Sequence, residues 1–294
     1  MSVLFYGDPH GTWQPLFDAV AQERPEAVVL MGDMDLDEPL DAKLAPLLDA
    51  GIDVRWIPGN HDSEGDNATA FHDRLFHAGR GLDQASLHAR IADVGGLRIA
   101  GLGGVFRGKV WNPKGEAPGD RVEPAAETRE GFVARISKQS RWRGGVPLKH
   151  QTTIFPEDVD ALRAATAVLG GADILVTHEA PSTDERGFAL IDQVAREVGA
   201  RLIVHGHLHH AYASETTDGI CVRELARAPS PGGCGAVKTS LLSAPRISAT
   251  RQLGSTCWNE QRCPSLPKLY DDDPFRSSEH VKGSLTCNAG TCLR

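Results

Sequence analysis

The sequence predicts an α/β fold in which parallel strands alternate with covering helices. Short aliphatic runs at residues 2–6, 27–31 and 52–57 are separated by stretches near 13–23 and 39–49 that carry apolar residues at helical spacing. A βαβαβ opening of this kind implies parallel strands with helices packed on them. Polar residues of metal-ligating types also follow several of the apolar runs directly, at the strand ends where open α/β sheets place their sites.

The alternation of strands and helices continues through the first 225 residues. Further helices are predicted near 67–77, 129–141, 156–169 and 184–198, and further strands at 173–177 and 201–205. Paired extended runs around Gly-containing turns predict two hairpins, one from 87–94 and 97–102 and one from 212–216 and 220–225.

Composition places the chain among ordinary globular proteins. It has 294 residues, of which 40% are hydrophobic and 24% are charged. No apolar run approaches the ~20 residues that a membrane span needs. The N-terminus enters the first strand without a basic segment, so we expect no signal peptide, no membrane contact and a cytoplasmic location.

The pattern fades after about residue 226, where Pro, Ser, Gly and Thr dominate and no helical or strand period persists. All six cysteines lie after residue 220, in spacings that do not resemble a zinc site. We therefore expect one domain at 1–225 and an irregular tail at 226–294, either poorly ordered or foreign to the fold.

Charge is distributed unevenly along the chain. Residues 226–294 carry nine Lys/Arg and five Asp/Glu, so their +4 leaves −12 on residues 1–225 of the chain's total of −8. An acidic body disfavours long nucleic acids, whose affinity comes from neutralised phosphates. The expected partner is a small phosphoester substrate.

Residues 105–150 differ from the acidic body, with ten Lys/Arg against five Asp/Glu. The segment is either a solvated loop or a basic cap that meets a phosphate-bearing substrate. In the second case Arg107, Lys149 and His150 are candidate substrate contacts, with His209 as a further one beside the last histidine motif.

Seven residues after the apolar runs are candidate metal ligands: Asp8, His10, Asp33, Asn60, His178, His205 and His207. Hard oxygens and imidazoles without thiolates suit Mn, Fe or Zn ions. Seven ligands are too many for one tetrahedral ion and suit two divalent ions that share a carboxylate, with Asp33 as the expected bridge. One ion would then take Asp8, His10 and His207, and the other Asn60, His178 and His205.

Two ions held in this way activate a water to hydroxide near neutral pH and neutralise phosphoryl oxygens. The bridging hydroxide is the expected nucleophile. The leaving group still needs a proton, which His61 is placed to supply, with Asp62 expected to hold its tautomer.

These motifs resemble the calcineurin-like metallophosphoesterase superfamily, in its small bacterial type. The resemblance spans about residues 1–225 and lies in Asp-x-His, Gly-Asp, Gly-Asn-His-Asp, a lone His and Gly-His-x-His, in that order. It implies a four-layer αββα sandwich of two mixed sheets, the seven metal ligands named above, His61 as catalytic histidine and Asp62 as its partner. The usual Gly-Asp-x-x-Asp is replaced by Gly32-Asp33-Met34-Asp35-Leu36-Asp37, and the sequence looks unlike the protein phosphatase branch.

The expected activity is metal-dependent hydrolysis of a phosphomonoester or phosphodiester. Two alternatives stay open. The basic segment at 105–150 keeps a nuclease of the same superfamily in view, acting on DNA or RNA ends. The other alternative is a non-catalytic scaffold with the same fold. Against it, a residue of a metal-ligating type occupies every position at which a ligand is expected.

Overall fold

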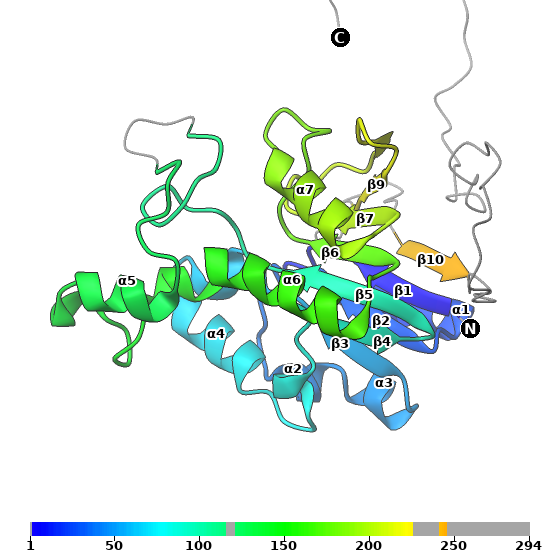
Figure 1. Ribbon diagram of the computed structural model, residues 1–294. Coiled ribbons are helices and arrows are strands. Elements are labelled where there is room, and N and C mark those ends of the chain that lie inside the picture. The colour runs from blue at the N-terminus through cyan, green and yellow to red at the C-terminus, as the bar shows by residue number, and fades with distance from the viewer. Residues whose placement is uncertain (1, 116–120, 226–240, 246–294) are drawn as a thin grey trace, which may run out of the picture. The chain divides into compact units, whose positions relative to one another are not determined.

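A computed structural model of the chain describes residues 2–115, 121–225 and 241–245 (Figure 1). The strands are β1 (Ser2–Tyr6), β2 (Ala27–Leu30), β3 (Asp53–Trp56), β4 (Arg90–Val94), β5 (Leu97–Leu102), β6 (Ile174–Thr177), β7 (Leu202–His205), β8 (Ala213–Glu215), β9 (Cys221–Glu224) and β10 (Leu241–Pro245). The α-helices are α1 (Gln14–Glu23), α2 (Leu40–Lys43), α3 (Ala45–Asp49), α4 (Ala68–Phe76), α5 (Arg129–Arg135), α6 (Pro156–Leu169) and α7 (Ala189–Val198). Short 3₁₀ turns are η1 (His61–Ser63), η2 (Leu82–Gln84), η3 (Lys138–Ser140) and η4 (Leu148–Thr152).

The described strands form two mixed sheets, in the orders β10-β1-β2-β3 and β4-β5-β6-β7-β9-β8. The first sheet is parallel except for the antiparallel pairing of β1 with β10. The second is parallel from β5 to β9, and the β4–β5 and β8–β9 hairpins close its two edges with antiparallel pairs. Both predicted hairpins are confirmed.

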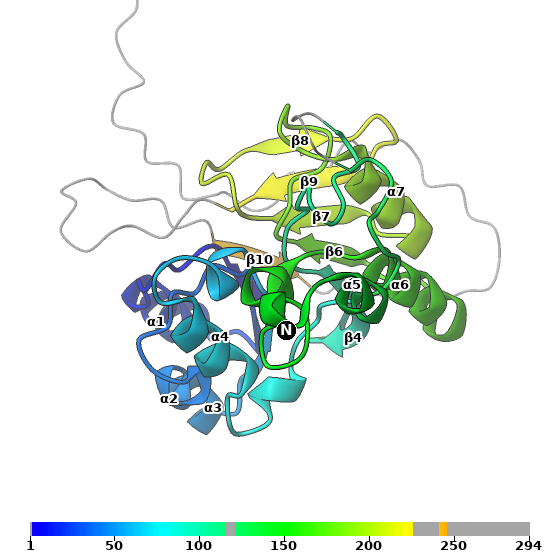
Figure 2. The same ribbon diagram turned by 90° about the vertical axis from the view of Figure 1, so that its left-hand side faces the viewer.

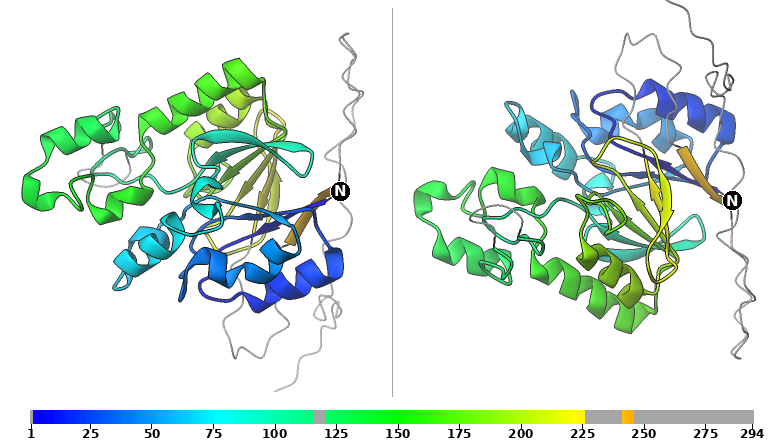
Figure 3. Two further views of the ribbon diagram at one scale, coloured as in Figure 1. Left: turned by 90° about the horizontal axis from the view of Figure 1, so that it is seen from below. Right: turned by 90° about the horizontal axis from the view of Figure 1, so that it is seen from above.

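The sheets lie face to face between two helical layers (Figure 3). Leu4, Leu30 and Trp56 of the first sheet pack with residues of α1 to α4 in one core cluster. Residues of the second sheet, Leu175 and Ile203 among them, pack with α6 and α7 in another.

The opposite faces of the strands are also buried. Val3, Phe5, Ile99 and Val176 are fully inaccessible, and the β4–β5 turn at Gly95 abuts Val3. Strands with two buried faces explain the near-continuous aliphatic runs in the sequence. The predicted four-layer αββα sandwich is confirmed.

Three predicted helices have different bounds in the structure. The predicted helix at 39–49 divides into α2 and α3, because Pro46 has no N–H to continue the helical ladder. The helix expected to reach residue 141 ends at Arg135, after which Ile136 is extended. Helix α7 begins at Ala189 rather than 184, because Gly187 packs against the backbone of Pro181 in a turn.

Most of the predicted tail at 226–294 lies outside the described residues, so its order and its origin stay predictions. Residues 241–245, however, form β10 at the edge of the first sheet (Figure 2). This strand is not predicted from the sequence, because two leucines flanked by Ser and Pro give too short a pattern.

Residues 105–153, called the insertion below, leave the second sheet after β5 and return before α6. The two ends meet, since Val105 N–H donates to Thr152 O and Ile154 N–H donates to Val105 O. The insertion carries α5, and it projects to one side of the sheets in Figures 1 and 3. Residues 116–120 within it lie outside the described residues.

Asp158, on the first turn of α6, joins the insertion to the body. Its carboxylate accepts the Phe155 N–H at 2.8 Å and two hydrogen bonds from the Arg129 guanidinium, and it lies 3.2 Å from His88 Nε2. Burial by itself would raise the pKa of Asp158, but His88 and Arg129 hold it well below its ordinary value. The stabilisation from this depressed pKa is present above pH ~4 and is lost as the pH falls.

We expect Asp158→Asn to lower the free energy of unfolding by about 2–3 kcal/mol, since it weakens the charge-assisted hydrogen bonds with Arg129. Denaturant unfolding at pH 7 checks this value. Asp160→Asn on the same helix is the matched control, and its exposed side chain predicts a change within about 0.5 kcal/mol. A difference between wild type and Asp158→Asn that did not shrink near pH 3 would contradict the electrostatic explanation.

Within the described residues, no helix is long and apolar enough to cross a membrane.

Candidate metal centre

The residues of the centre lie on turns that follow β1, β2, β3, β6 and β7, as the sequence predicts. Several of these turns hold non-glycine residues with positive φ: Asp8 (34°), His10 (42°), Asp33 (52°), His207 (75°) and His209 (67°). Backbone conformations of this kind are costly for side chains other than glycine and cluster at functional sites. They turn the side chains of separate strands toward one region.

Two glycines let the backbone approach the carboxylates closely. A Cβ on Gly59 would lie 2.2 Å from Asp33 Oδ1, and a Cβ on Gly206 would lie 2.6 Å from Asp8 Oδ1. Neither position accepts a side chain without displacing a buried carboxylate. The glycines of Gly59-Asn60-His61-Asp62 and His205-Gly206-His207 therefore shape the site as well as the turns.

Two histidines have one ring nitrogen fixed and the other directed into the centre. His178 Nδ1 donates to Met31 O at 2.9 Å, which leaves Nε2 3.3 Å from both Asp33 Oδ1 and Asn60 Oδ1. His10 Nδ1 donates to Asp35 Oδ2 at 2.9 Å, which leaves Nε2 3.2 Å from His209 Nε2 and 3.7 Å from Asp33 Oδ2. A hydrogen bond that orients the far nitrogen is the usual arrangement of a metal-ligating histidine.

Asp33 stands between two groups of ligand atoms. One group contains His10, Asp33 and His209, and the other contains Asp33, His178 and His207, with ligand atoms within 4.8 Å of one another in each. Asp8 Oδ2 lies 3.9 Å from His209 Nε2 in the first group. Asn60 adjoins the second through His178. The position expected of a shared ligand is therefore occupied by Asp33.

The electrostatics of the centre favour a cation. Burial, together with the charge of Asp33, raises the pKa of Asp8 to about 6, although His178 and other neighbours oppose the rise. Burial by itself would lower the pKa of His178, but Asp33 and Asp8 raise it to about 10. Burial lowers the pKa of His207 to about 3, which keeps its imidazole neutral. Positive charge is thus stabilised between the two buried carboxylates.

The residues present fit divalent metal ions. Asp8 Oδ1 is buried and has no hydrogen-bond partner among the described residues, a costly state unless a cation lies near it. Carboxylate oxygens, an amide oxygen and imidazole nitrogens without thiolate suit Mn, Fe or Zn. Asp8, His10, Asp33 and His209 would hold one ion, and Asp33, Asn60, His178 and His207 the other.

His205 is brought to a different place from the one the sequence analysis assigns. Its Nδ1 donates to Gly206 O at 3.1 Å, and its Nε2 accepts from the Tyr212 hydroxyl at 2.9 Å. Both ring nitrogens of this fully buried residue are therefore occupied. Among the described residues, no group of ligand atoms includes His205.

His209, expected near the substrate, takes the position predicted for a second C-terminal ligand. The chain reverses after β7, so His205 stays on the strand while His207 and His209 lie against Asp8. The His207 N–H donates to Asp8 Oδ2, and His209 Nε2 lies near the same oxygen. The signal was present in the sequence, because Gly206-His207-Leu208-His209 itself has the order Gly-His-x-His. The structure therefore brings His207 and His209 into the groups of potential ligand atoms, in place of the expected pair of His205 and His207.

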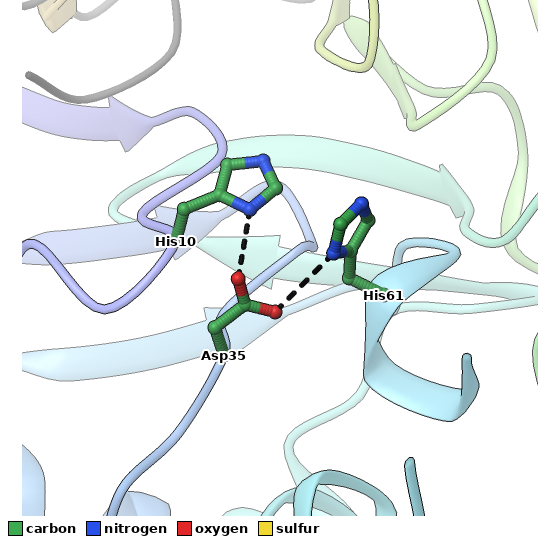
Figure 4. A group of neighbouring side chains, drawn as sticks. All are labelled: His10, Asp35 and His61. Atoms are coloured by element: carbon green, nitrogen blue, oxygen red, sulfur yellow. Dashed lines mark hydrogen bonds and ion pairs between the residues drawn. The ribbon is translucent and has the colours of Figure 1, made fainter. Parts of the chain in front are cut away.

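His61 lies at the edge of the centre and contacts Asp35 (Figure 4). Asp35 Oδ2 accepts from His10 Nδ1, and its Oδ1 lies 3.5 Å from His61 Nδ1. The contact with Asp35 raises the pKa of His61, and its side chain is 47% exposed. An accessible imidazole with a raised pKa beside a metal centre can donate a proton to a leaving group.

Asp62 does not contact the His61 imidazole, contrary to the prediction. Its buried carboxylate accepts the backbone N–H groups of Gly59 at 2.7 Å, Met34 at 3.0 Å and Asp33 at 3.1 Å. The 3₁₀ turn η1 directs this side chain inward while His61 points outward. Asp62 therefore holds the turns after β2 and β3 together, and Asp35 takes the place of the carboxylate partner.

The three basic candidates of the insertion differ in accessibility. Arg107 is buried and donates to Thr152 O and Thr153 Oγ1. His150 is buried too, its Nδ1 lies 3.0 Å from Thr153 Oγ1, and burial together with nearby cations lowers its pKa to about 4. Neither is free to meet a substrate. Lys149 has a 63% exposed side chain at the rim of the centre, where it pairs with Glu64.

Comparison with known proteins agrees with this combination of sandwich fold and histidine–carboxylate centre, which together define a phosphoesterase. The model of the family described as calcineurin-like phosphoesterase matches residues 1–211. An uncharacterized protein from Haemophilus influenzae is 36% identical over 216 residues, 73% of this chain and 86% of that protein. The chain belongs to the calcineurin-like phosphoesterase family and is a hydrolase of phosphoesters, as the resemblance of its motifs predicts.

Solved structures with a related fold include a dimetal phosphatase from Danio rerio and a phosphopantetheinyl hydrolase from Mycobacterium tuberculosis. The first is 15% identical with a TM-score of 0.45, and the match covers 77% of this chain and 87% of the other. The second is 17% identical with a TM-score of 0.42, and the match covers 77% and 89%.

Proposed function

We propose that the protein hydrolyses a phosphomonoester or phosphodiester of a small molecule with two divalent metal ions. The observation that carries the proposal is the gathering of four histidines around two buried carboxylates, Asp8 and Asp33. When bound, the ions supply an activated water and offset the negative charge that grows on the phosphoryl oxygens.

The chain's own residues orient these parts and supply the proton. Asp35 fixes His10 and also raises the pKa of His61, which favours the protonated imidazole whose Nε2 can donate to the oxygen of the leaving group. His178 Nδ1 and the carbonyl of Met31 fix one ligand ring, and Asp62 fixes the turns on which Asp33 and Asn60 stand. The insertion adjoins Asn60 through Glu64, which pairs with Lys149 and Arg107.

The test uses metal-stripped protein with Mn²⁺ returned, and p-nitrophenyl phosphate and bis-p-nitrophenyl phosphate as substrates. We expect activity only with metal, and the ratio of the two rates distinguishes a monoesterase from a diesterase. Folded, metal-loaded protein that cleaved neither substrate would contradict the proposal. It would instead support the non-catalytic scaffold or, if an oligonucleotide were cleaved, the nuclease.

The nuclease alternative loses support from the pairing of basic residues in the insertion. Arg107 is paired with Glu64, Arg129 with Asp158, and Arg143 with Asp73. Paired cations neutralise few additional phosphates. A salt-dependent affinity for a single-stranded oligonucleotide would nevertheless revive this alternative. The cytoplasmic location stays a prediction from the sequence.

Asp35→Asn is expected to reduce kcat by about 10–100-fold, the usual effect of removing the hydrogen-bond partner of a ligand or catalytic group. An amide cannot accept from both His10 and His61 while stabilising a protonated imidazole. Asp37→Asn is the control, because Asp37 is exposed and pairs with Lys43. Steady-state kinetics with Mn²⁺ checks the effect, and equal rates for the two variants would exclude Asp35 from the mechanism.

A further inference from the structure

Glu64 connects the metal centre to the insertion. Asn60 Nδ2 donates to Glu64 Oε2 at 3.3 Å, and Asn60 Oδ1 faces His178 Nε2. Glu64 Oε1 lies 2.8 Å from Lys149 Nζ and 3.3 Å from Arg107 Nη2. The Glu64 carboxylate therefore faces two cations of the insertion. It also fixes the side-chain amide of Asn60, whose oxygen is directed to the metal centre.

The two cations are held very differently. Arg107 is buried, and its Nη1 donates to Thr152 O at 2.8 Å and to Thr153 Oγ1 at 2.9 Å, besides the contact with Glu64. Leaving this position would expose unpaired polar groups in the interior. Arg107 is thus a fixed partner that neutralises Glu64.

Lys149 is the surplus and accessible cation. Its side chain is 63% exposed, and a solvent-exposed ion pair of this kind contributes little to stability. With Glu64 already neutralised by Arg107, the three groups together carry +1. The lysine can leave Glu64 at small cost for a second anion.

We propose that Lys149 is a specificity-determining residue that binds a second anionic group of the substrate, a phosphate or a carboxylate, beside the phosphoester held at the metal centre. The inference rests on the proposed function, since it assumes that a phosphoester binds there. When such a substrate binds, the Lys149 ammonium leaves Glu64 and pairs with the second anionic group. Arg107 remains paired with Glu64, so the hydrogen bond from Asn60 to Glu64 keeps the orientation of the amide. Substrates with one anionic group leave Lys149 on Glu64.

The test measures binding of non-hydrolysable phosphonates to Mn²⁺-loaded protein by titration calorimetry. Propylphosphonate has one anionic group, 3-phosphonopropionate adds a carboxylate, and 1,3-propylenediphosphonate adds a second phosphonate. We expect wild type to bind one or both of the doubly anionic compounds about tenfold more tightly than propylphosphonate, the effect of one charge-assisted hydrogen bond. If only one of the two compounds binds more tightly, its second group, carboxylate or phosphonate, identifies the anion that Lys149 prefers.

In Lys149→Met the preference should vanish, and in Lys149→Arg part of it should return. Lys138→Met, in the exposed η3 turn of the same insertion, is the matched control and should keep the preference. Equal affinity of wild type for all three compounds, or a preference that survives Lys149→Met, would overturn the assignment. Hydrolysis of p-nitrophenyl phosphate by the same preparation separates the two claims. An active enzyme without the preference overturns only the role of Lys149, whereas an inactive enzyme overturns both.

Discussion

Replacing His209 by alanine is expected to remove about one of the two bound metal ions and to lower kcat by more than about 100-fold. Even the hydrogen-bond partners of metal ligands are worth 10–100-fold, so the loss of a ligand should exceed that range. The reason lies in the geometry, since His209 Nε2 is 3.2 Å from His10 Nε2 and 3.9 Å from Asp8 Oδ2. Metal content per chain, measured by plasma emission after desalting, checks the prediction.

His205→Gln is the matched variant, because it removes the nearby histidine at the end of β7. An amide can still accept from the Tyr212 hydroxyl, so we expect both ions to be retained, with a modest loss of stability from the buried substitution. Circular dichroism verifies that each variant is folded. If His205→Gln lost an ion and His209→Ala kept both, the original assignment from the sequence would be restored.

Replacing His61 by alanine is expected to lower kcat by ~10²–10⁴-fold, the usual contribution of general acid catalysis. Metal content should stay at the wild-type value, because Asp35 rather than a ligand residue holds the His61 ring. The loss should be much larger for an alkyl phosphate than for p-nitrophenyl phosphate, whose leaving group departs with little need of a proton. This comparison distinguishes proton donation from a structural effect.

The Asp62→Asn variant serves as the control for His61→Ala. Asp62 accepts three backbone N–H groups and does not contact the His61 ring, so its replacement should lower stability and reduce activity toward both substrates alike. A dependence on the leaving group that appeared in Asp62→Asn and not in His61→Ala would contradict the assignment of Asp35 as the partner of His61.

The sequence by itself determined the order of most elements between residues 2 and 225 and the strand ends at which Asp8, Asp33, Asn60 and His178 stand, and the resemblance of its motifs implied the sandwich. The strands and their ends are predictable because each buried strand is a local run of aliphatic residues that ends in Gly or Pro. Residues directly after such runs fall at one edge of a sheet whatever the details of packing. The family motifs depend on the same local spacing.

Only the tertiary structure decided which side chains meet. His205 and His209 are only four residues apart. Because the chain reverses at Gly206, His205 contacts Tyr212 and His209 contacts His10. The sequence does not distinguish Asp35 from Asp62 as a partner for His61. In the structure, η1 directs the Asp62 carboxylate inward, where it accepts three backbone N–H groups, and Asp35 contacts the His61 ring instead. Spacing fixes the positions of residues along the chain, whereas the direction of each side chain depends on backbone torsions and on partners that are distant in sequence.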